Sequence, residues 1–229
     1  SPEPELVMWG VDTELFAADR HRKRAGELRL GLGIADDELC LLSPRQNTSN
    51  YHTDRIIAAF ARSTWPAKGV LVIKLHGRAG QGERRHKLIH HALEAGVAER
   101  VRFAGKYTYE DLPAVYAMAD AAVSALEADG VPSTFCELMA LGVPIVATDL
   151  DSYEGVLDEG RGMLVPPADV DAMAAAFDQL AESAELRASF ARKGREHAVS
   201  ALSWERSVTR WEQLYYDALT TASKAESNV

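Results

Sequence analysis

Short apolar runs and longer amphipathic segments alternate along the chain from about residue 38 to residue 180. Short apolar runs bounded by polar loops are typical of buried strands, whereas apolar residues at helical spacing are typical of helices that cover a sheet. Strands are expected at 39–42, 70–73, 101–103, 121–126, 144–148 and 162–165. Helices are expected around 56–60, 88–93, 111–118, 133–141, 170–180, 185–198 and 204–219. The alternation predicts an α/β fold, a doubly wound Rossmann-like parallel sheet with helices on both faces.

The segment from 133 to 148 has the clearest boundaries. Gly142 follows an apolar helical stretch, and glycine suits the left-handed position that ends a helix. Pro144 then prevents the helix from continuing and begins the next strand. Ligands of a doubly wound sheet bind outside the carboxyl ends of its strands. The loops that follow the strands are therefore where candidate chemistry is expected.

Composition and charge narrow the range of functions. The chain has 229 residues, of which 47% are hydrophobic, and can bury a core without disulfides. The 34 acidic residues outnumber the 25 basic ones and give a formal charge of −9, which argues against nucleic acid as a partner. Cys40 and Cys136 each lie in an apolar stretch, which favours small buried side chains in a reducing, cytoplasmic compartment. The apolar runs fall far short of the ~18–20 residues of a membrane span.

The loop before the expected helix 133–141 has the features of a phosphate site. It contains Gly and Pro, and Ser133 and Thr134 open the helix. Backbone N–H groups, hydroxyls and the positive end of a helix dipole together bind phosphate. The alternative is ordinary N-capping, because caps strongly favour Ser and Thr. The acidic pair Asp129 and Glu137 favours a ligand site, because a charged Glu rarely interrupts so apolar a helix.

The stretch ELMALGVP at 137–144 resembles the carboxylate motif of the retaining GT-B glycosyltransferases of family 4, also called glycosyl transferase group 1. That motif is normally written as Glu, seven residues, Glu and then Ala-Met-Ala-x-Gly-x-Pro. Asp129 stands in place of the first Glu and is one methylene shorter. Further similar segments are GVDTELF at 10–16, FAG at 103–105, YEDLP at 109–113 and YAMAD at 116–120. The resemblance covers nearly the whole chain and implies the C-terminal half of a GT-B fold.

The resemblance also implies roles for individual residues. Glu137 would hold the ribose hydroxyls of a nucleotide-sugar, Asp129 would approach the donor sugar, and Arg45 would face the diphosphate. These three are the expected catalytic residues. The expected donor-binding residues are the backbone of Pro132, Ser133, Thr134 and Phe135 for the diphosphate, Lys106 and Tyr107 for the nucleobase, and His76 and Gly77 after the second strand.

The chain departs from the family pattern in the loop after the first strand. The family has a lysine there that stabilises the leaving nucleotide, whereas residues 46–53 contain none. Either Lys106 substitutes for it or activity is reduced, because each positive group at such a site contributes roughly 2–4 kcal/mol. Lys74, at the end of the second expected strand, is expected to flank the same crevice.

No metal or other cofactor is expected beside the donor substrate. Arg45 and the helix N-terminus supply positive charge that a divalent ion would otherwise give. His86, His90 and Glu94 follow helical spacing, but their basic surroundings are typical of a solvated helix face.

The expected organisation is an interdomain linker at 1–20, a nucleotide-sugar-binding domain at 21–202, a C-terminal helix at 203–222 that packs toward a missing N-terminal domain, and a frayed tail at 223–229. The expected function is binding of a UDP- or GDP-sugar for retaining transfer of a hexose to an acceptor hydroxyl. The chain alone is expected to be inactive, because the acceptor domain is absent, and any peripheral membrane association is expected only through that domain. Two alternatives stay open: a non-catalytic nucleotide or sugar-phosphate binding module, and an interaction domain that docks through 204–219.

Overall fold

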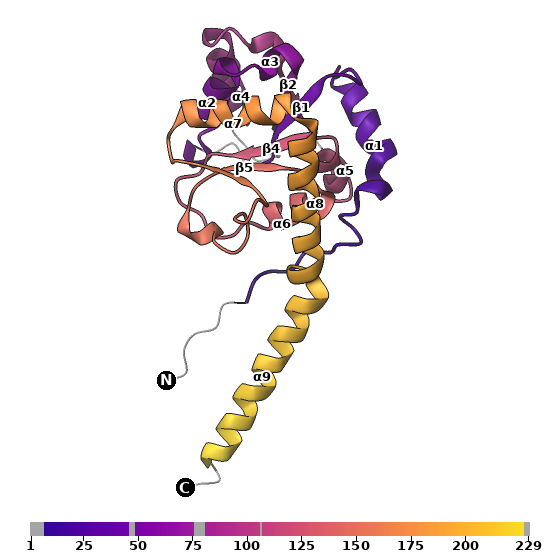
Figure 1. The fold of residues 1–229 in the computed structure, drawn as a ribbon, viewed down its shortest axis with the longest axis vertical. Coiled ribbons are helices and arrows are strands. Elements are labelled where there is room, and N and C mark those ends of the chain that lie inside the picture. Colours follow the sequence, from indigo (N-terminus) through magenta and orange to yellow (C-terminus); the bar gives the residue numbers. More distant parts are fainter. Residues whose placement is uncertain (1–6, 46–48, 76–80, 106, 227–229) are drawn as a thin grey trace.

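A computed structural model describes residues 7–45, 49–75, 81–105 and 107–226 of the chain. Six strands form one sheet in the order β3-β2-β1-β4-β5-β6, and all neighbours in it run parallel. The strands are β1 (Leu39–Ser43), β2 (Gly69–Lys74), β3 (Val101–Ala104), β4 (Ala121–Ser124), β5 (Ile145–Thr148) and β6 (Met163–Val165). Helices flank the sheet (Figure 1). The predicted doubly wound fold is confirmed.

The two faces of the sheet bury separate apolar layers. One face is covered by α2 (Thr53–Arg62), α3 (Trp65–Lys68), α4 (Gln81–Glu94) and α7 (Val170–Glu182). The other is covered by α1 (Ala18–Gly31), α5 (Leu112–Ala117) and α6 (Ser133–Leu141), with α8 (Ala184–Ala201) packed against α6. Successive strand residues point to opposite faces, so that Leu41 joins the first layer and Leu42 the second.

The order of the strands reverses between β1 and β4. From β1 the chain builds outward through β2 and β3, and it then returns to place β4, β5 and β6 on the other side of β1. This reversal opens a crevice at the carboxyl ends of β1 and β4, the usual ligand position in such sheets. The loop after β1 carries Arg45 and the loop after β4 carries Asp129. The fold therefore brings the two expected site loops together.

Helix α1 was not predicted, because it lacks the apolar stripe that marks a covering helix. Ala25 is the only buried residue within its bounds. Polar contacts hold the helix instead: the Arg29 guanidinium donates to the carbonyls of Met118 and Glu38 and forms an ion pair with Asp120 at 3.1 Å. The helix begins at Ala18, inside the segment expected to be a linker. A helix held by polar contacts to distant residues shows no apolar period in its sequence.

Residues 9–12 lie beside the start of α9 (Trp204–Glu226). The Val11 N–H donates to the Leu202 carbonyl at 2.8 Å, and the Trp204 N–H donates to the Val11 carbonyl at 2.9 Å. Gly10 permits this approach, because a Cβ there would lie 2.5 Å from Trp204 Cα. Among the described residues, short 3-10 helices also lie at Ser49–Tyr51, Ala98–Arg100 and Asp151–Tyr153.

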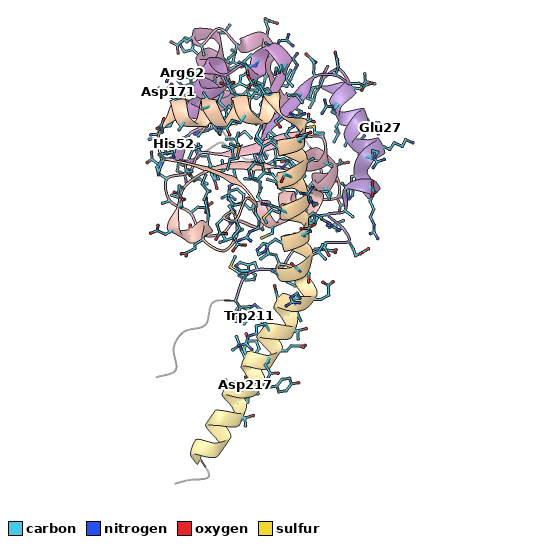
Figure 2. The ribbon with its side chains drawn as sticks, in the orientation of Figure 1. Glu27, His52, Arg62, Asp171, Trp211 and Asp217 are labelled. Atoms are coloured by element: carbon cyan, nitrogen blue, oxygen red, sulfur yellow. The ribbon has the colours of Figure 1, made fainter. Side chains whose placement is uncertain are left out.

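Helix α9 leaves the body of the domain and projects away from it (Figure 1). Large apolar side chains are exposed along it, namely Trp204, Trp211, Tyr215, Tyr216 and Leu219. Figure 2 shows Trp211 and Asp217 on this projecting part of the helix. Within the described parts of the chain, no helix combines the length and the apolar character that crossing a membrane requires.

Candidate functional site

The loop 125–132 joins β4 to α6 at the carboxyl edge of the sheet. The Thr148 hydroxyl at the end of β5 donates to the Leu126 carbonyl and ties this loop to the next strand. Pro132 takes the N-cap position of α6, and its side chain has no hydrogen-bond acceptor. Ser133 and Thr134 follow inside the helix, so the N-capping interpretation of these residues is wrong. The first turn of α6 therefore has the electrostatics of an anion-binding helix N-terminus.

Arg45 and Asp129 form an ion pair at the crevice. Arg45 Nη2 lies 2.9 Å from Asp129 Oδ2, and the two side chains are only 14% and 20% exposed. The Arg45 guanidinium also lies 5.2 Å from the centre of the Tyr51 ring. Its Nε is buried with no hydrogen-bond partner among the described residues. Arg45 therefore keeps donor capacity for a ligand while Asp129 orients it.

Tyr153 is a member of this group that the sequence did not predict. Its hydroxyl donates to Asp129 Oδ2 at 3.4 Å, and its ring packs edge to face against Phe135, with centroids 5.0 Å apart. Burial, and next the Asp129 carboxylate, raise the pKa of Tyr153, so that the phenol stays a hydrogen-bond donor. Tyr153 thus links Asp129 to the first turn of α6. A tyrosine in a loop after β5 carries no local signal of this role.

Glu137 lies half-buried in α6 and lines a cavity of about 520 Å³. Other lining residues are Trp9, Asp12, Tyr109, Ser133 and Trp204. Burial raises the pKa of Glu137, while the positive charges of Lys74 and Arg45 oppose that rise. The cavity beside Glu137 therefore explains why a charged residue stands in an otherwise apolar helix.

Lys74, the last residue of β2, belongs to the same site. Its Nζ donates to the Tyr116 hydroxyl at 3.3 Å and lies 5.3 Å and 5.8 Å from the ring centres of Tyr116 and Tyr107. Burial lowers the pKa of Lys74 to about 8, and Glu137 acts in the opposite direction. From the sequence, Lys74 was expected only to flank the crevice. In the structure its charge also interacts with the charges of Glu137 and Arg45.

The remaining predicted residues are distributed as follows. Pro132 and Phe135 are buried, Ser133 is exposed and Thr134 is half-buried, all at the start of α6. Tyr107, expected near the nucleobase, lies beside Lys74. His76, Gly77 and Lys106 lie outside the described residues, so the substitution of the missing loop lysine by Lys106 stays a prediction.

The histidines of α4 lie on an exposed helix face, where His90 Nε2 is 3.2 Å from Glu94 Oε1. Over the parts of the chain with described structure, no group of three or more His, Cys, Asp and Glu side chains is arranged to hold a metal ion.

Comparison with known proteins shows the family of this chain. Residues 26–197 match the family model described as glycosyl transferases group 1. A GDP-mannose-dependent alpha-(1-6)-phosphatidylinositol monomannoside mannosyltransferase of Mycolicibacterium smegmatis is 31% identical, over 90% of this chain and 54% of the relative. A D-inositol 3-phosphate glycosyltransferase of Salinispora arenicola is 30% identical, over 98% of this chain and 52% of the relative.

Solved structures share the fold. Sucrose-phosphate synthase from Thermosynechococcus elongatus superposes with a TM-score of 0.82 at 24% identity, over 96% of this chain and 54% of that one. The Anabaena protein HepE in complex with UDP gives 0.83 at 17% identity, over 93% of this chain and 57% of that one. The chain spans about half the length of the relatives it matches. Because the family model matches most of the sheet and its helices, the chain belongs to the glycosyl transferases group 1 family, as the motif at 137–144 predicted.

Proposed function

We propose that this chain is the donor-binding half of a retaining glycosyltransferase and that it binds a nucleoside diphosphate sugar. The observation that carries the proposal is that Ser133 and Glu137 of α6 line one cavity, while the Arg45–Asp129 pair is joined through Tyr153 to Phe135 in the first turn of the same helix. A GDP-mannose-dependent relative and a solved relative of the same fold with UDP support UDP and GDP as the nucleotides to test first.

Each group has a role in this proposal. The first turn of α6 and Arg45 bind the diphosphate, Glu137 accepts hydrogen bonds from the ribose hydroxyls, and Asp129 contacts the sugar. During transfer the bond between the anomeric carbon and the diphosphate oxygen breaks, and that oxygen keeps the electron pair. A new bond forms from the anomeric carbon to the acceptor oxygen with the same anomeric configuration, and the proton of the acceptor hydroxyl passes to the leaving diphosphate oxygen. Arg45 and the helix dipole offset the charge that develops on the leaving diphosphate.

We infer that transfer also needs a second domain that binds the acceptor. The relatives are about twice as long as the chain, which leaves room for such a domain. Helix α9 exposes Trp204, Trp211, Tyr215 and Tyr216, and exposed apolar surface of this kind is typical of an interface. We propose that the acceptor domain packs on α9, so that residues 1–229 bind the donor without transferring the sugar.

Calorimetric titration of the chain with UDP and with GDP in EDTA tests the proposal. We expect one nucleotide per chain and unchanged affinity when Mg²⁺ replaces EDTA, because Arg45 and the helix N-terminus supply the positive charge. Pyrophosphate is the control and is expected to bind more weakly, because it makes no contact with Glu137. Binding of neither nucleotide would refute the proposed function, and binding only with a divalent metal would refute the assignment of charge to Arg45.

A further inference from the structure

Tyr153 is held firmly in the loop between β5 and β6. Its side chain is fully buried, and its ring packs edge to face against Phe135 of α6, with centroids 5.0 Å apart. Its backbone N–H donates to the Leu150 carbonyl at 2.9 Å, and its carbonyl accepts from the N–H groups of Val156 and Leu157 at 3.0 and 3.1 Å. The phenol therefore has a fixed position relative to α6.

The guanidinium of Arg161 holds the rest of this loop. The Arg161 side chain is only 11% exposed and donates to the carbonyls of Gly155 and Val156 at 3.0 and 2.9 Å. It also forms ion pairs with the carboxylates of Asp158 and Glu159. These contacts join the end of the loop to its middle. Tyr153 is thus carried by a loop that is itself held in one shape, as a positioning side chain requires.

The Asp129 carboxylate has donors from two other elements. Arg45 Nη2 lies 2.9 Å and the Tyr153 hydroxyl 3.4 Å from the same oxygen, Oδ2. The terminal torsion of an aspartate is broad, so a single contact would leave the carboxylate free to turn. Two donors on Oδ2 remove that freedom. Among the described residues, both hydrogen bonds of Asp129 end on Oδ2, which leaves Oδ1 to accept from a ligand.

Orientation matters more for Asp129 than it would for a glutamate. Asp129 stands where the family motif has Glu, and its side chain is one methylene shorter. A shorter side chain reaches a given sugar hydroxyl from fewer orientations, so a carboxylate that turns away loses the contact. Tyr153 is 0% exposed and does not reach a ligand itself. Any effect of its hydroxyl on a ligand must therefore pass through Asp129.

We propose that Tyr153 is a positioning residue for the donor sugar, whose hydroxyl fixes Asp129 so that Oδ1 accepts a hydrogen bond from a sugar hydroxyl. This inference rests on the proposed function. It assigns to the loop after β5 a task that the motif at 137–144 does not include. It also implies that Tyr153 affects the affinity for the sugar part of the donor and leaves the nucleotide part unchanged.

The test measures the affinities of UDP, UDP-glucose, GDP and GDP-mannose by calorimetry. The quantity compared is the ratio of the affinity for the nucleotide-sugar to that for its nucleotide. The proteins are the wild type, Tyr153→Phe, Asp129→Asn and the double variant. Tyr153→Phe removes the hydroxyl and keeps the ring that packs on Phe135. Thermal unfolding confirms that each variant is folded.

The matched control is Thr148→Val. The buried Thr148 hydroxyl donates to the Leu126 carbonyl, in the same loop that carries Asp129. This variant also removes one buried hydroxyl that holds the loop, but the lost contact does not involve the Asp129 side chain. It should therefore keep the wild-type ratio even where its melting temperature falls.

Tyr153→Phe should lower the ratio about 3- to 10-fold, the scale of one hydrogen bond, and leave the affinity for the nucleotide unchanged. Asp129→Asn should lower the ratio at least as far. Adding Tyr153→Phe to Asp129→Asn should lower it no further, because the carboxylate that Tyr153 orients is already absent. Such non-additivity is the sign of two residues that act as one unit, and a merely structural role would not produce it.

The outcomes separate this inference from the proposed function. If the wild type binds neither UDP nor GDP, the proposed function itself is wrong. If it binds one of them and Tyr153→Phe keeps the wild-type ratio, the role of Tyr153 is wrong while the donor site stands. Additive effects in the double variant would show that Tyr153 acts independently of Asp129. An equal fall of the ratio in Thr148→Val would trace the effect to the whole loop, and either result overturns the inference.

Discussion

Glu137→Gln should bind UDP or GDP about 10- to 100-fold more weakly than the wild type, because a neutral amide replaces a charged acceptor of two ribose hydrogen bonds. The stability of the folded chain should not fall together with the nucleotide affinity. Burial raises the pKa of Glu137 in the folded chain, so the ionised carboxylate costs free energy of folding near neutral pH. The amide removes that cost but also leaves the buried Lys74 without the negative charge of Glu137, so the melting temperature should stay nearly unchanged. Calorimetry and thermal unfolding measure the two effects.

Asp129→Asn is the contrasting variant. Its carboxylate is proposed to contact the sugar, so the loss should appear with UDP-glucose or GDP-mannose and not with UDP or GDP. Asp129 also holds Arg45, and releasing the guanidinium leaves it available to the diphosphate. Equal affinity of the wild type and Glu137→Gln for the nucleotide would show that the match to the family motif has no functional meaning at its strongest residue.

Arg45→Met should also weaken UDP or GDP about 10- to 100-fold, because a charge-assisted contact with the diphosphate is lost. Binding of uridine or guanosine should be unchanged, since these nucleosides carry no phosphate. The substitution leaves Asp129 with Tyr153 as its partner, and the free energy of unfolding should fall by about 1–3 kcal/mol, the cost of a poorly satisfied buried group. Nucleotide titration and chemical denaturation measure these effects.

The matched control for Arg45→Met is Arg55→Met. Arg55 forms an ion pair with Glu127, in the loop that also carries Asp129, but Glu127 is 45% exposed. Removing an exposed pair changes stability by less than about 1 kcal/mol and should leave nucleotide affinity unchanged. If Arg55→Met lost as much affinity as Arg45→Met, the effect would come from general disturbance of the loop, and Arg45 would have no specific role.

The helix α6 shows how far a sequence can predict structure. Its first and last residues, Ser133 and Leu141, were both predicted correctly, because a proline precedes the helix and a glycine follows it. Pro132 occupies the N-cap, and Gly142 takes the left-handed conformation at φ 70°. Helix α1 was missed because Arg29 holds it through hydrogen bonds to distant carbonyls and not through an apolar face. Residues that begin or end a helix and an apolar period along the sequence predict an element. A helix held by polar contacts to distant residues shows neither signal.

The candidate site was predicted in part for a similar reason. Glu137 belongs to a contiguous motif, and Arg45 follows a strand that ends at the crevice, so both can be found along the chain. Tyr153, Tyr116 and Lys74 come from three other elements, and their approach to the site depends on strand order and packing. Residues 46–53 contain no lysine, and the lysine whose charge interacts with that of Glu137 is Lys74 at the end of β2.

A crystal structure of the chain with UDP or GDP, whichever binds more tightly, tests donor binding most directly. We expect the ribose hydroxyls within hydrogen-bond distance of Glu137 and the diphosphate between the first turn of α6 and Arg45. A second cavity, of about 480 Å³, lies at the opposite edge of the sheet and is lined by Lys68, Arg100 and Arg187 among others. Nucleotide bound in that cavity, with the crevice beside Glu137 empty, would show that Glu137 and Arg45 do not form the donor site.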